Sequence, residues 1–247
     1  IKKAIPLADQ IACVSEATEN GLHTVIPATK GRTKIIHNGF NSTFQNHPHS
    51  VVESKLSGLK IPDKGPILLH VGGNAWYKNR IGTIKILHAY MVQHSNPNAH
   101  LVLVGPDLDA DQTAYAEKHK LIPHIQTTGP LEHTQLEALY CKANALLFPS
   151  RYEGFGWPPL EAQKCGCPVV TSKNGSLEEV VGKSAPTAEW DDTPSHVKAL
   201  NRILEDPVYR KKLIKSGFQN VRRFSTQKMA EAFCEIYCKM ESQTGPS

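Results

Sequence analysis

The sequence lacks the features that mark membrane-spanning and secreted proteins. No apolar run approaches the ~20 residues that cross a bilayer, and the chain does not open with a charged segment followed by an apolar one. Its six cysteines have neither the paired short spacings of a zinc ribbon nor the density of a secreted disulfide scaffold. We therefore expect a cytoplasmic protein with buried, unpaired thiols, and peripheral attachment at the inner membrane face is the alternative.

The rest of the composition is that of a soluble globular enzyme. Of the 247 residues, 40% are hydrophobic and 21% are charged, and this length allows one large or two modest domains. The 28 basic and 23 acidic residues give a formal charge of +5, which suits small anionic ligands or a lipid surface and does not require nucleic acid. Basic residues concentrate at 210–223, where a solvated helix face is the simpler interpretation and phospholipid attraction the alternative.

Strands and helices alternate along most of the chain. Short apolar runs, typical of strands buried on both faces, are separated by the one-sided apolar patterns of helices. Early strands are expected at 11–14 and 34–37, and the polar stretch 41–64 is interpreted as a linker with one helix at 50–56. We then expect strands at 67–71, 101–104, 125–128, 145–148 and 168–171, and helices at 80–94, 112–120, 132–142, 158–164 and 226–240. This pattern predicts an α/β fold with a doubly wound, Rossmann-like parallel sheet.

The segment 153–162 carries the clearest chemical pattern. Gly154 and Gly156 lack Cβ, so the backbone there can adopt positive φ and approach a ligand closely. The prolines at 158–159 favour a helix start, where free amides and the helix dipole suit a diphosphate. Glu161, expected in the first turn of that helix, can accept two hydrogen bonds from a ribose diol, and Glu153 can accept hydroxyls of a different ring. The alternative is a solvated Glu153 and a Glu161 that only complements the helix dipole.

Other candidates follow the strand at 67–71, because ligands of such sheets bind beyond the carboxyl ends of the strands. A glycine turn with Gly72, Gly73 and Asn74 comes directly after this strand. Lys78, just before the next helix, can neutralise a diphosphate as a mobile point charge. Taken alone, Lys78 is also explained as a solvated surface lysine.

A metal site is not expected. Asp107, Asp109 and Asp111 are spaced like cation ligands, but a calcium loop would need glycine and glutamate where Gln112 and Lys118 stand. We expect these aspartates to form an acidic loop that caps the following helix. The scattered histidines show no metal-binding spacing and are expected to be structural.

The segment 153–162 resembles the E-x7-E region of the family 4 retaining glycosyltransferases, which have the two-domain GT-B fold. The similarity has strong motifs over residues 66–192 and is weaker over residues 8–44. The resemblance implies that the doubly wound domain is the carboxy-terminal, donor-binding half of a GT-B enzyme. The domain boundaries that it implies are 1–44 for the tail of the amino-terminal domain, 45–65 for a linker, 66–224 for the nucleotide-sugar-binding domain, and 225–247 for a helix crossing back toward the amino-terminal domain, with a tail.

The resemblance also implies a role for each residue of the pattern. Glu153 would contact the transferred sugar and Glu161 the nucleotide ribose, and both Glu153 and Lys78 would be catalytic. The remaining donor-binding positions are Gly72, Gly73, Asn74 and Lys78 near the diphosphate, Gly154, Phe155 and Gly156 near the sugar and phosphates, and Gly129 and Leu131 beside the base. Many family members also have an arginine just after the glycine of the first loop, where this chain has Gly73 or Asn74, and Arg80 is the candidate substitute.

The sequence therefore predicts the donor-binding portion of a retaining glycosyltransferase in glycan or glycolipid synthesis. It would transfer a hexose from a nucleoside diphosphate sugar, with UDP or GDP, to a hydroxyl of a glycan or lipid-linked acceptor, without metal or other cofactor. Because the chain starts with Ile1, we expect a fragment, a processed chain or one half of a split enzyme. The alternatives are a non-catalytic or split-enzyme subunit that needs a partner chain, and a glycoside hydrolase that uses Glu153 and Glu161 as acid and base.

Overall fold

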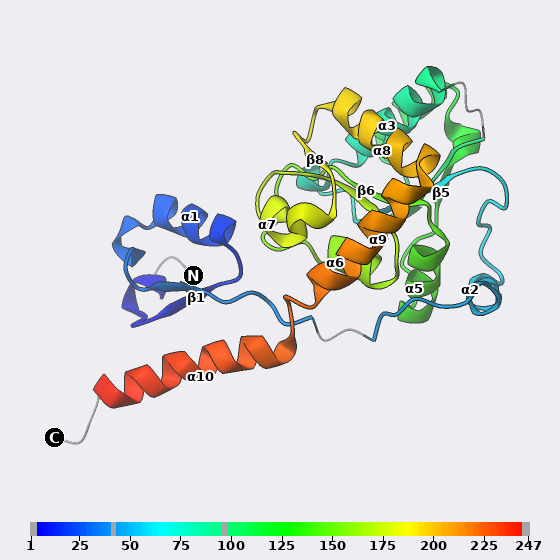
Figure 1. Ribbon diagram of the computed structural model, residues 1–247. Coiled ribbons are helices and arrows are strands. Elements are labelled where there is room, and N and C mark those ends of the chain that lie inside the picture. The colour runs from blue at the N-terminus through cyan, green and yellow to red at the C-terminus, as the bar shows by residue number, and fades with distance from the viewer. Residues whose placement is uncertain (1–3, 41–42, 95–97, 244–247) are drawn as a thin grey trace. The chain divides into compact units, whose positions relative to one another are not determined.

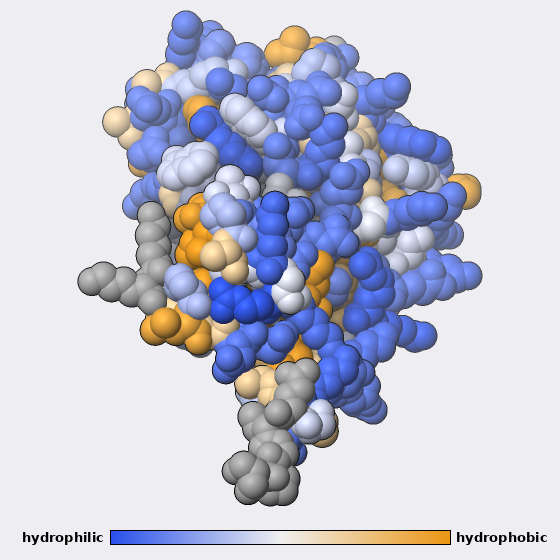
Figure 2. All heavy atoms as spheres, turned by 90° about the vertical axis from the view of Figure 1, so that its left-hand side faces the viewer, coloured by the Kyte–Doolittle hydropathy of each residue, from blue (hydrophilic) through white to orange (hydrophobic). Residues whose placement is uncertain are grey.

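A computed structural model describes residues 4–40, 43–94 and 98–243. These residues form two compact units. The first combines residues of the ranges 1–42 and 221–247, and the second spans 43–220 (Figure 1). None of the helices within the described ranges is both long and apolar enough to cross a membrane. On the face shown in Figure 2, hydrophilic residues predominate and apolar residues gather in small groups.

The first unit is a small α/β element. Its parts are η1 (Ile5–Leu7), β1 (Ile11–Cys13), α1 (Glu16–Val25), η2 (Pro27–Thr29), β2 (Thr33–Ile35) and α10 (Thr226–Gln243). The strands β1 and β2 pair in parallel. Ser15 caps α1 by accepting a hydrogen bond from the Thr18 amide at 3.1 Å. Lys34 of β2 and Glu235 of α10 form an ion pair at 2.8 Å, so α10 belongs to the same unit as the amino-terminal strands.

The second unit contains a six-stranded parallel sheet. Its strands are β3 (Ile67–Val71), β4 (His100–Val104), β5 (Ile125–Thr127), β6 (Ala145–Phe148), β7 (Val169–Ser172) and β8 (Thr187–Ala188). They lie in the order β5-β4-β3-β6-β7-β8. The chain moves outward from β3 through β4 to β5 and then returns to the other side of β3, so the strand order reverses between β3 and β6. In open α/β sheets, this switch point is where ligands bind.

Helices precede, connect and follow these strands. They are α2 (His49–Leu56), η3 (Trp76–Lys78), α3 (Arg80–Gln93), α4 (Ala110–Lys118), η4 (Ile122–His124), α5 (His133–Lys142), α6 (Trp157–Lys164), α7 (Leu177–Val181), η5 (Gly182–Ser184), α8 (Thr193–Glu205) and α9 (Pro207–Val221). The predicted α/β fold with a doubly wound parallel sheet is confirmed, and most predicted strands and helices match within two residues. The elements α7, β8 and α8 are not among those predicted.

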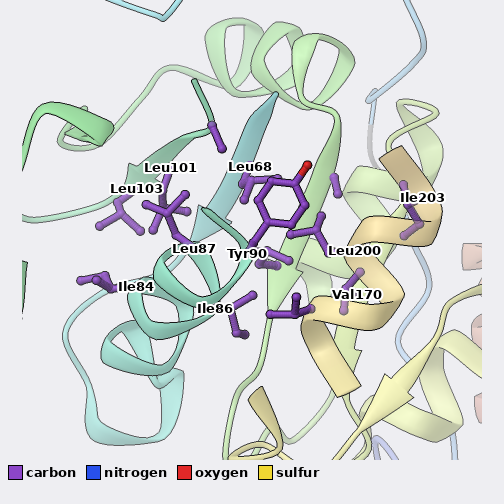
Figure 3. Close-up of a cluster of buried hydrophobic side chains, with 14 of the residues drawn as sticks. Leu68, Ile84, Ile86, Leu87, Tyr90, Leu101, Leu103, Val170, Leu200 and Ile203 are labelled. Carbon is purple, nitrogen blue, oxygen red and sulfur yellow. The ribbon is translucent and has the colours of Figure 1, made fainter. Parts of the chain in front are cut away.

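A core of apolar side chains joins the sheet to α3 and α8 (Figure 3). Alternate residues of parallel strands point to opposite faces, and Leu68 and Leu101 contribute to this side of the sheet. From the helices come Leu87, Tyr90 and Leu200, each fully buried. Such burial stabilises the domain by about 1.5–3 kcal/mol for each large apolar side chain. It holds the sheet in place, and the loops at the carboxyl ends of its strands form the candidate site.

The predicted linker at 45–65 is part of the second unit. Its helix α2 contacts α5, and Val52 and Leu56, four residues apart on one face, are both buried.

The cysteines also differ in part from expectation. All are unpaired, but Cys234 and Cys238 of α10 are exposed rather than buried.

Candidate functional site

Three glycines bring together the loops that follow β3, β4 and β5. The Gly72 amide donates to the Val104 carbonyl at 3.0 Å, and the Gly105 amide donates to the Gly129 carbonyl at 3.2 Å. Gly105 has φ +139°, and a Cβ at this position would lie 2.5 Å from the Gly72 carbonyl oxygen. Only glycine fits such a close approach. Gly105 was not predicted as a site residue, although its place directly after a strand was a usable signal.

The side chain of Asn74 is occupied in holding these loops together. Its oxygen accepts hydrogen bonds from Nη1 of Arg80 and from Nε2 of Gln112, the latter at 3.2 Å. Its Nδ2 donates to the Asp107 carbonyl at 3.0 Å. The predicted donor-binding residue Asn74 therefore ties the loop after β3 to the loop after β4.

Arg80 serves the same network. Its Nη1 also donates to the Pro106 carbonyl at 2.8 Å, and the residue is buried at the start of α3. Burial lowers the pKa of Arg80, opposed by the carboxylates of Asp109 and Asp107. Its Nε and Nη2 are buried and have no hydrogen-bond partner among the described residues. Because these two atoms are enclosed and Nη1 is bonded to Asn74 and Pro106, Arg80 holds the loops together. Its substitution for the family arginine stays a prediction.

Lys78 lies at the end of η3, next to a residue with a left-handed backbone. Asn79 has φ +52°, and its side chain donates to the carbonyls of Pro149 at 2.8 Å and Trp190 at 3.0 Å. Asparagine tolerates this conformation better than most residues. The Lys78 ammonium contacts Oε1 of Glu153 at 2.8 Å. Asn79 thus anchors the turn that brings the two predicted catalytic residues into direct contact.

Glu153 is a buried residue with only 8% of its surface exposed, so the alternative of a solvated loop carboxylate is wrong. Its loop is held by the segment before α7. Ser176 donates its hydroxyl to the carbonyls of Glu153 at 3.0 Å and Phe155 at 2.8 Å. A Cβ at Gly175, which has φ +63°, would lie 2.7 Å from the Glu153 nitrogen. Gly175 and Ser176 were not predicted, and the turn-forming pair Asn174-Gly175 before an apolar helix was the available signal.

The helix start that was predicted to bind phosphate contains two prolines, which lack amide hydrogens. Gly156 has φ +101° and precedes α6, as its lack of Cβ suggested, while the Phe155 side chain is buried. Helix α6 begins at Trp157, so Pro158 and Pro159 occupy its first turn and contribute no amide hydrogens. The two prolines therefore reduce the number of amides that this helix start can offer to an anion, and the helix dipole remains.

Glu161 is the fifth residue of α6 and lies in its second turn, not in the first as predicted. The helix starts one residue earlier than the prolines indicated. The Tyr140 hydroxyl of α5 donates to Oε2 of Glu161 at 2.8 Å. Burial raises the pKa of Glu161, while the Tyr140 hydrogen bond and the nearby His133 act to lower it. A half-buried carboxylate with a dedicated donor does more than complement a helix dipole.

The other predicted site residues lie in the joined loops. Gly72 is next to Lys78, since a Cβ on Gly72 would lie 3.3 Å from Cδ of Lys78. Gly129 has φ +67°, and Leu131, two residues further, is partly exposed. Gly73 has open space around it. Gly154 is also partly exposed, in the loop between β6 and α6.

The acidic loop and His70 form hydrogen bonds within the fold. Asp109 caps α4 by accepting a hydrogen bond from the Gln112 amide at 2.9 Å, as predicted. No group of three or more metal-ligating side chains occurs within residues 4–40, 43–94 and 98–243. His70 is buried with Nδ1 3.0 Å from the Leu147 carbonyl, and burial lowers its pKa to about 3. Its Nε2 finds no partner in the described part of the chain, so its hydrogen bonding is only half satisfied.

Comparison with known proteins agrees with this arrangement of loops. Residues 51–220 match the family model described as "Glycosyl transferases group 1". The chain belongs to this family of glycosyl transferases. The match includes β3 through α8 and every predicted donor-site residue.

This transferase family member is similar to two bacterial enzymes of known name. It is 31% identical to a glycogen synthase of Mycobacterium tuberculosis over 181 residues, covering 71% of this chain and 43% of that protein. It is 32% identical to the serotype-specific mannosyltransferase WbdA of Escherichia coli over 248 residues, covering 94% of this chain and 29% of that protein. The chain therefore spans less than half the length of these relatives.

Solved glycosyltransferase structures share its fold. The sucrose-phosphate synthase of Thermosynechococcus elongatus superimposes with a TM-score of 0.78 at 27% identity, covering 98% of this chain and 61% of that one. HepE of Anabaena, determined in complex with UDP and glucose, gives a TM-score of 0.82 at 19% identity, covering 96% and 65%. The fold is the Rossmann-like α/β fold of GT-B glycosyltransferases.

The close approach of Gly105 to Gly72 generates a stability prediction. In Gly105→Ala, the new methyl group would meet the Gly72 carbonyl oxygen, and the positive φ would be strained. We expect a loss of about 1–3 kcal/mol, which corresponds to roughly 2–4 °C in Tm for each kcal/mol. Thermal unfolding followed by circular dichroism measures the change. Gly73→Ala is the control, because its methyl group meets no atom within 4 Å, and equal Tm values for the two variants would contradict the argument.

Proposed function

We propose that this chain is the donor-binding portion of a retaining glycosyltransferase. The observation that carries the proposal is the 2.8 Å contact between Lys78 and Glu153 at the carboxyl end of the sheet. In a nucleoside diphosphate sugar, the sugar is attached directly to the terminal phosphate. A site for it must therefore place a cation for the phosphate beside an acceptor for sugar hydroxyls. This pair, in which Glu153 is buried and Lys78 is partly buried, has that chemistry and that spacing.

The donor would lie across the loops after β3, β5 and β6. Lys78 and the amides of the two glycine loops would hold the diphosphate, and Glu153 would accept hydroxyls of the hexose. Glu161 would accept both hydroxyls of the ribose, and the backbone near Leu131 would contact the base. The two relatives named above, a glycogen synthase and a mannosyltransferase, support a hexose as the transferred group. The structural similarity to HepE, which was determined with UDP and glucose, supports a nucleotide-sugar donor.

Transfer would proceed by front-face attack of an acceptor hydroxyl on the anomeric carbon, with retention of configuration. The bond from this carbon to the diphosphate oxygen breaks, the bond to the acceptor oxygen forms, and the hydroxyl proton passes to the departing diphosphate. Negative charge then develops on the departing diphosphate. Lys78 and the fixed loop amides would stabilise this charge without reorganisation, which is usually a large catalytic contribution. The acceptor would be a glycan or a lipid-linked glycan. Family membership in the glycosyl transferases argues against a hydrolase that uses Glu153 and Glu161 as acid and base.

The most informative experiment is a calorimetric screen of the chain against UDP, GDP, ADP and their hexose conjugates. We expect one nucleoside diphosphate and its sugar to bind, and this result names the base. If none of these ligands binds but a glycan without nucleotide does, the proposal is wrong.

The Lys78–Glu153 pair gives a prediction with two opposite signs. In Glu153→Gln, the sugar loses a charged acceptor worth about 1.5–3 kcal/mol, so the Kd of the nucleotide-sugar should rise roughly 10- to 100-fold. The freed ammonium of Lys78 should leave the affinity for the free nucleoside diphosphate unchanged or higher. Isothermal titration with both ligands measures the two effects. An equal loss of affinity for both would show that Glu153 does not distinguish the sugar.

Glu161 should act on the nucleotide itself. Glu161→Ala removes the ribose acceptor, and we expect the Kd of the free nucleoside diphosphate to rise about 10- to 100-fold. Glu117→Ala is the matched control, because Glu117 is an exposed residue on α4. Titration curves that coincide for wild type and Glu161→Ala would sink the ribose assignment.

We also propose that binding needs no divalent cation, since Lys78 supplies the positive charge beside the diphosphate. Adding excess EDTA should change the Kd of the nucleoside diphosphate by less than about twofold, well under 1 kcal/mol. Lys78→Ala, in the same buffers, should weaken binding with or without EDTA. A large loss on chelation that Mg²⁺ restores would overturn this part of the proposal.

A further inference from the structure

The buried hydroxyl of Tyr140 is aimed at the carboxylate that the proposed function gives to the ribose. We propose that Tyr140 is a positioning residue, which holds Glu161 in the orientation and charge state that the ribose diol requires. The inference rests on the proposed function. Its direct observation is the 2.8 Å hydrogen bond from the Tyr140 hydroxyl to Oε2 of Glu161, across the contact between α5 and α6.

The ring of Tyr140 is fixed by its surroundings. Tyr140 is fully buried, and Phe44 packs against it edge to face with ring centroids 5.8 Å apart. A buried aromatic side chain with two torsions loses little further entropy when its hydroxyl makes a hydrogen bond. The direction of the hydroxyl is therefore set by α5 and the core, independently of any ligand.

The Tyr140 hydroxyl remains a donor throughout the accessible pH range. Burial, with a further contribution from the Glu161 charge, raises the pKa of Tyr140 well above its usual value. A carboxylate has about four acceptor positions on its two oxygens, and the tyrosine occupies one of them. Glu161 can thus accept from Tyr140 and from both hydroxyls of a ribose at the same time.

Glu161 is subject to opposing influences. Burial raises its pKa, and the Tyr140 hydrogen bond and His133 lower it. Both of these helpers come from α5. The adjacent strands β6 and β7 present only apolar and hydroxyl side chains, and α7 carries the exposed Glu178 and the partly exposed Glu179. Because only the ionised carboxylate accepts two ribose hydroxyls, recognition of the diol should weaken as the pH falls through the pKa of Glu161.

The sign of a Tyr140→Phe substitution follows from this balance. Removing the hydroxyl takes away a group that lowers the pKa of Glu161, so that pKa rises. As the pH is lowered, ribose recognition by Tyr140→Phe should then be lost at a higher pH than recognition by wild type. A residue that only supported the fold would weaken all ligands equally and would not move this titration.

The experiment compares UDP with 2′-deoxy-UDP, or GDP with its 2′-deoxy form if GDP is the ligand found. The ratio of the two Kd values reports recognition of the ribose, and the titration of the phosphate, which is common to both ligands, cancels. The ratio is measured by calorimetry from pH 5 to pH 8 for wild type, Tyr140→Phe and Glu161→Gln. Tyr115→Phe is the matched control, since its hydroxyl contacts His88 on the other side of the sheet.

We expect a ratio of about tenfold or more for wild type, as for the loss of a hydrogen bond to a charged group. This ratio should fall at low pH. In Tyr140→Phe the fall should move to higher pH, in Glu161→Gln the ratio should be small at every pH, and Tyr115→Phe should match wild type. If Tyr140→Phe also matches wild type while Glu161→Gln loses discrimination, the positioning role is wrong and the proposed function stands. If Glu161→Gln keeps the full ratio, the ribose assignment itself is wrong.

A second variant keeps the test decisive if Tyr140→Phe is too unstable to assay. Site-specific 3-fluorotyrosine at position 140 retains the ring and hydroxyl and makes the phenol more acidic, and hence a stronger donor. The fall in the ratio should then move to lower pH, opposite to the effect of phenylalanine. An unchanged profile with the fluorinated residue would overturn the inference.

Discussion

The loops at the carboxyl end of the sheet depend on one ion pair, in which the ammonium of Lys78 meets the buried carboxylate of Glu153. Removing one partner of such a pair leaves an uncompensated charge, and the attraction offsets the cost of desolvation only where the geometry of the pair is good. Here Asn79 anchors one side and Ser176 the other. The pair thus links the loop after β3 to the loop after β6 across the switch point of the sheet.

Glycine contacts extend this arrangement to the outer strands. Backbone hydrogen bonds from Gly72 to Val104 and from Gly105 to Gly129 connect the loops after three strands, and Gly105 lies close to the Gly72 carbonyl. The side chain of Asn74 adds hydrogen bonds from Arg80 of α3 and from Gln112 of α4. The result is a site whose backbone is fixed before a ligand arrives, which lowers the entropic cost of binding.

Much of this could be predicted from the sequence, for identifiable reasons. Buried parallel strands such as β4 and β6 are short and wholly apolar, and local pattern alone defines them. Glu153, Glu161 and Lys78 stand in a spacing that resembles a known family. Gly105 and Ser176 escaped prediction because their partners are far away in sequence, and a single chain does not reveal which carbonyl a glycine or serine meets. Arg80 shows the same limit, since its charge was evident but its burial among the loops was not.

The clamp formed by Gly175 and Ser176 has a consequence for how this loop can change. It grips the main chain of the Glu153 loop and not its side chains. Neighbouring positions such as Tyr152, which is 45% exposed, can therefore vary in size and polarity while the path of the loop stays the same. The path of this loop and the chemistry of its exposed side chains can therefore change independently. A scaffold of this kind can acquire new selectivity by exchanging rim side chains without redesigning the turn beneath them.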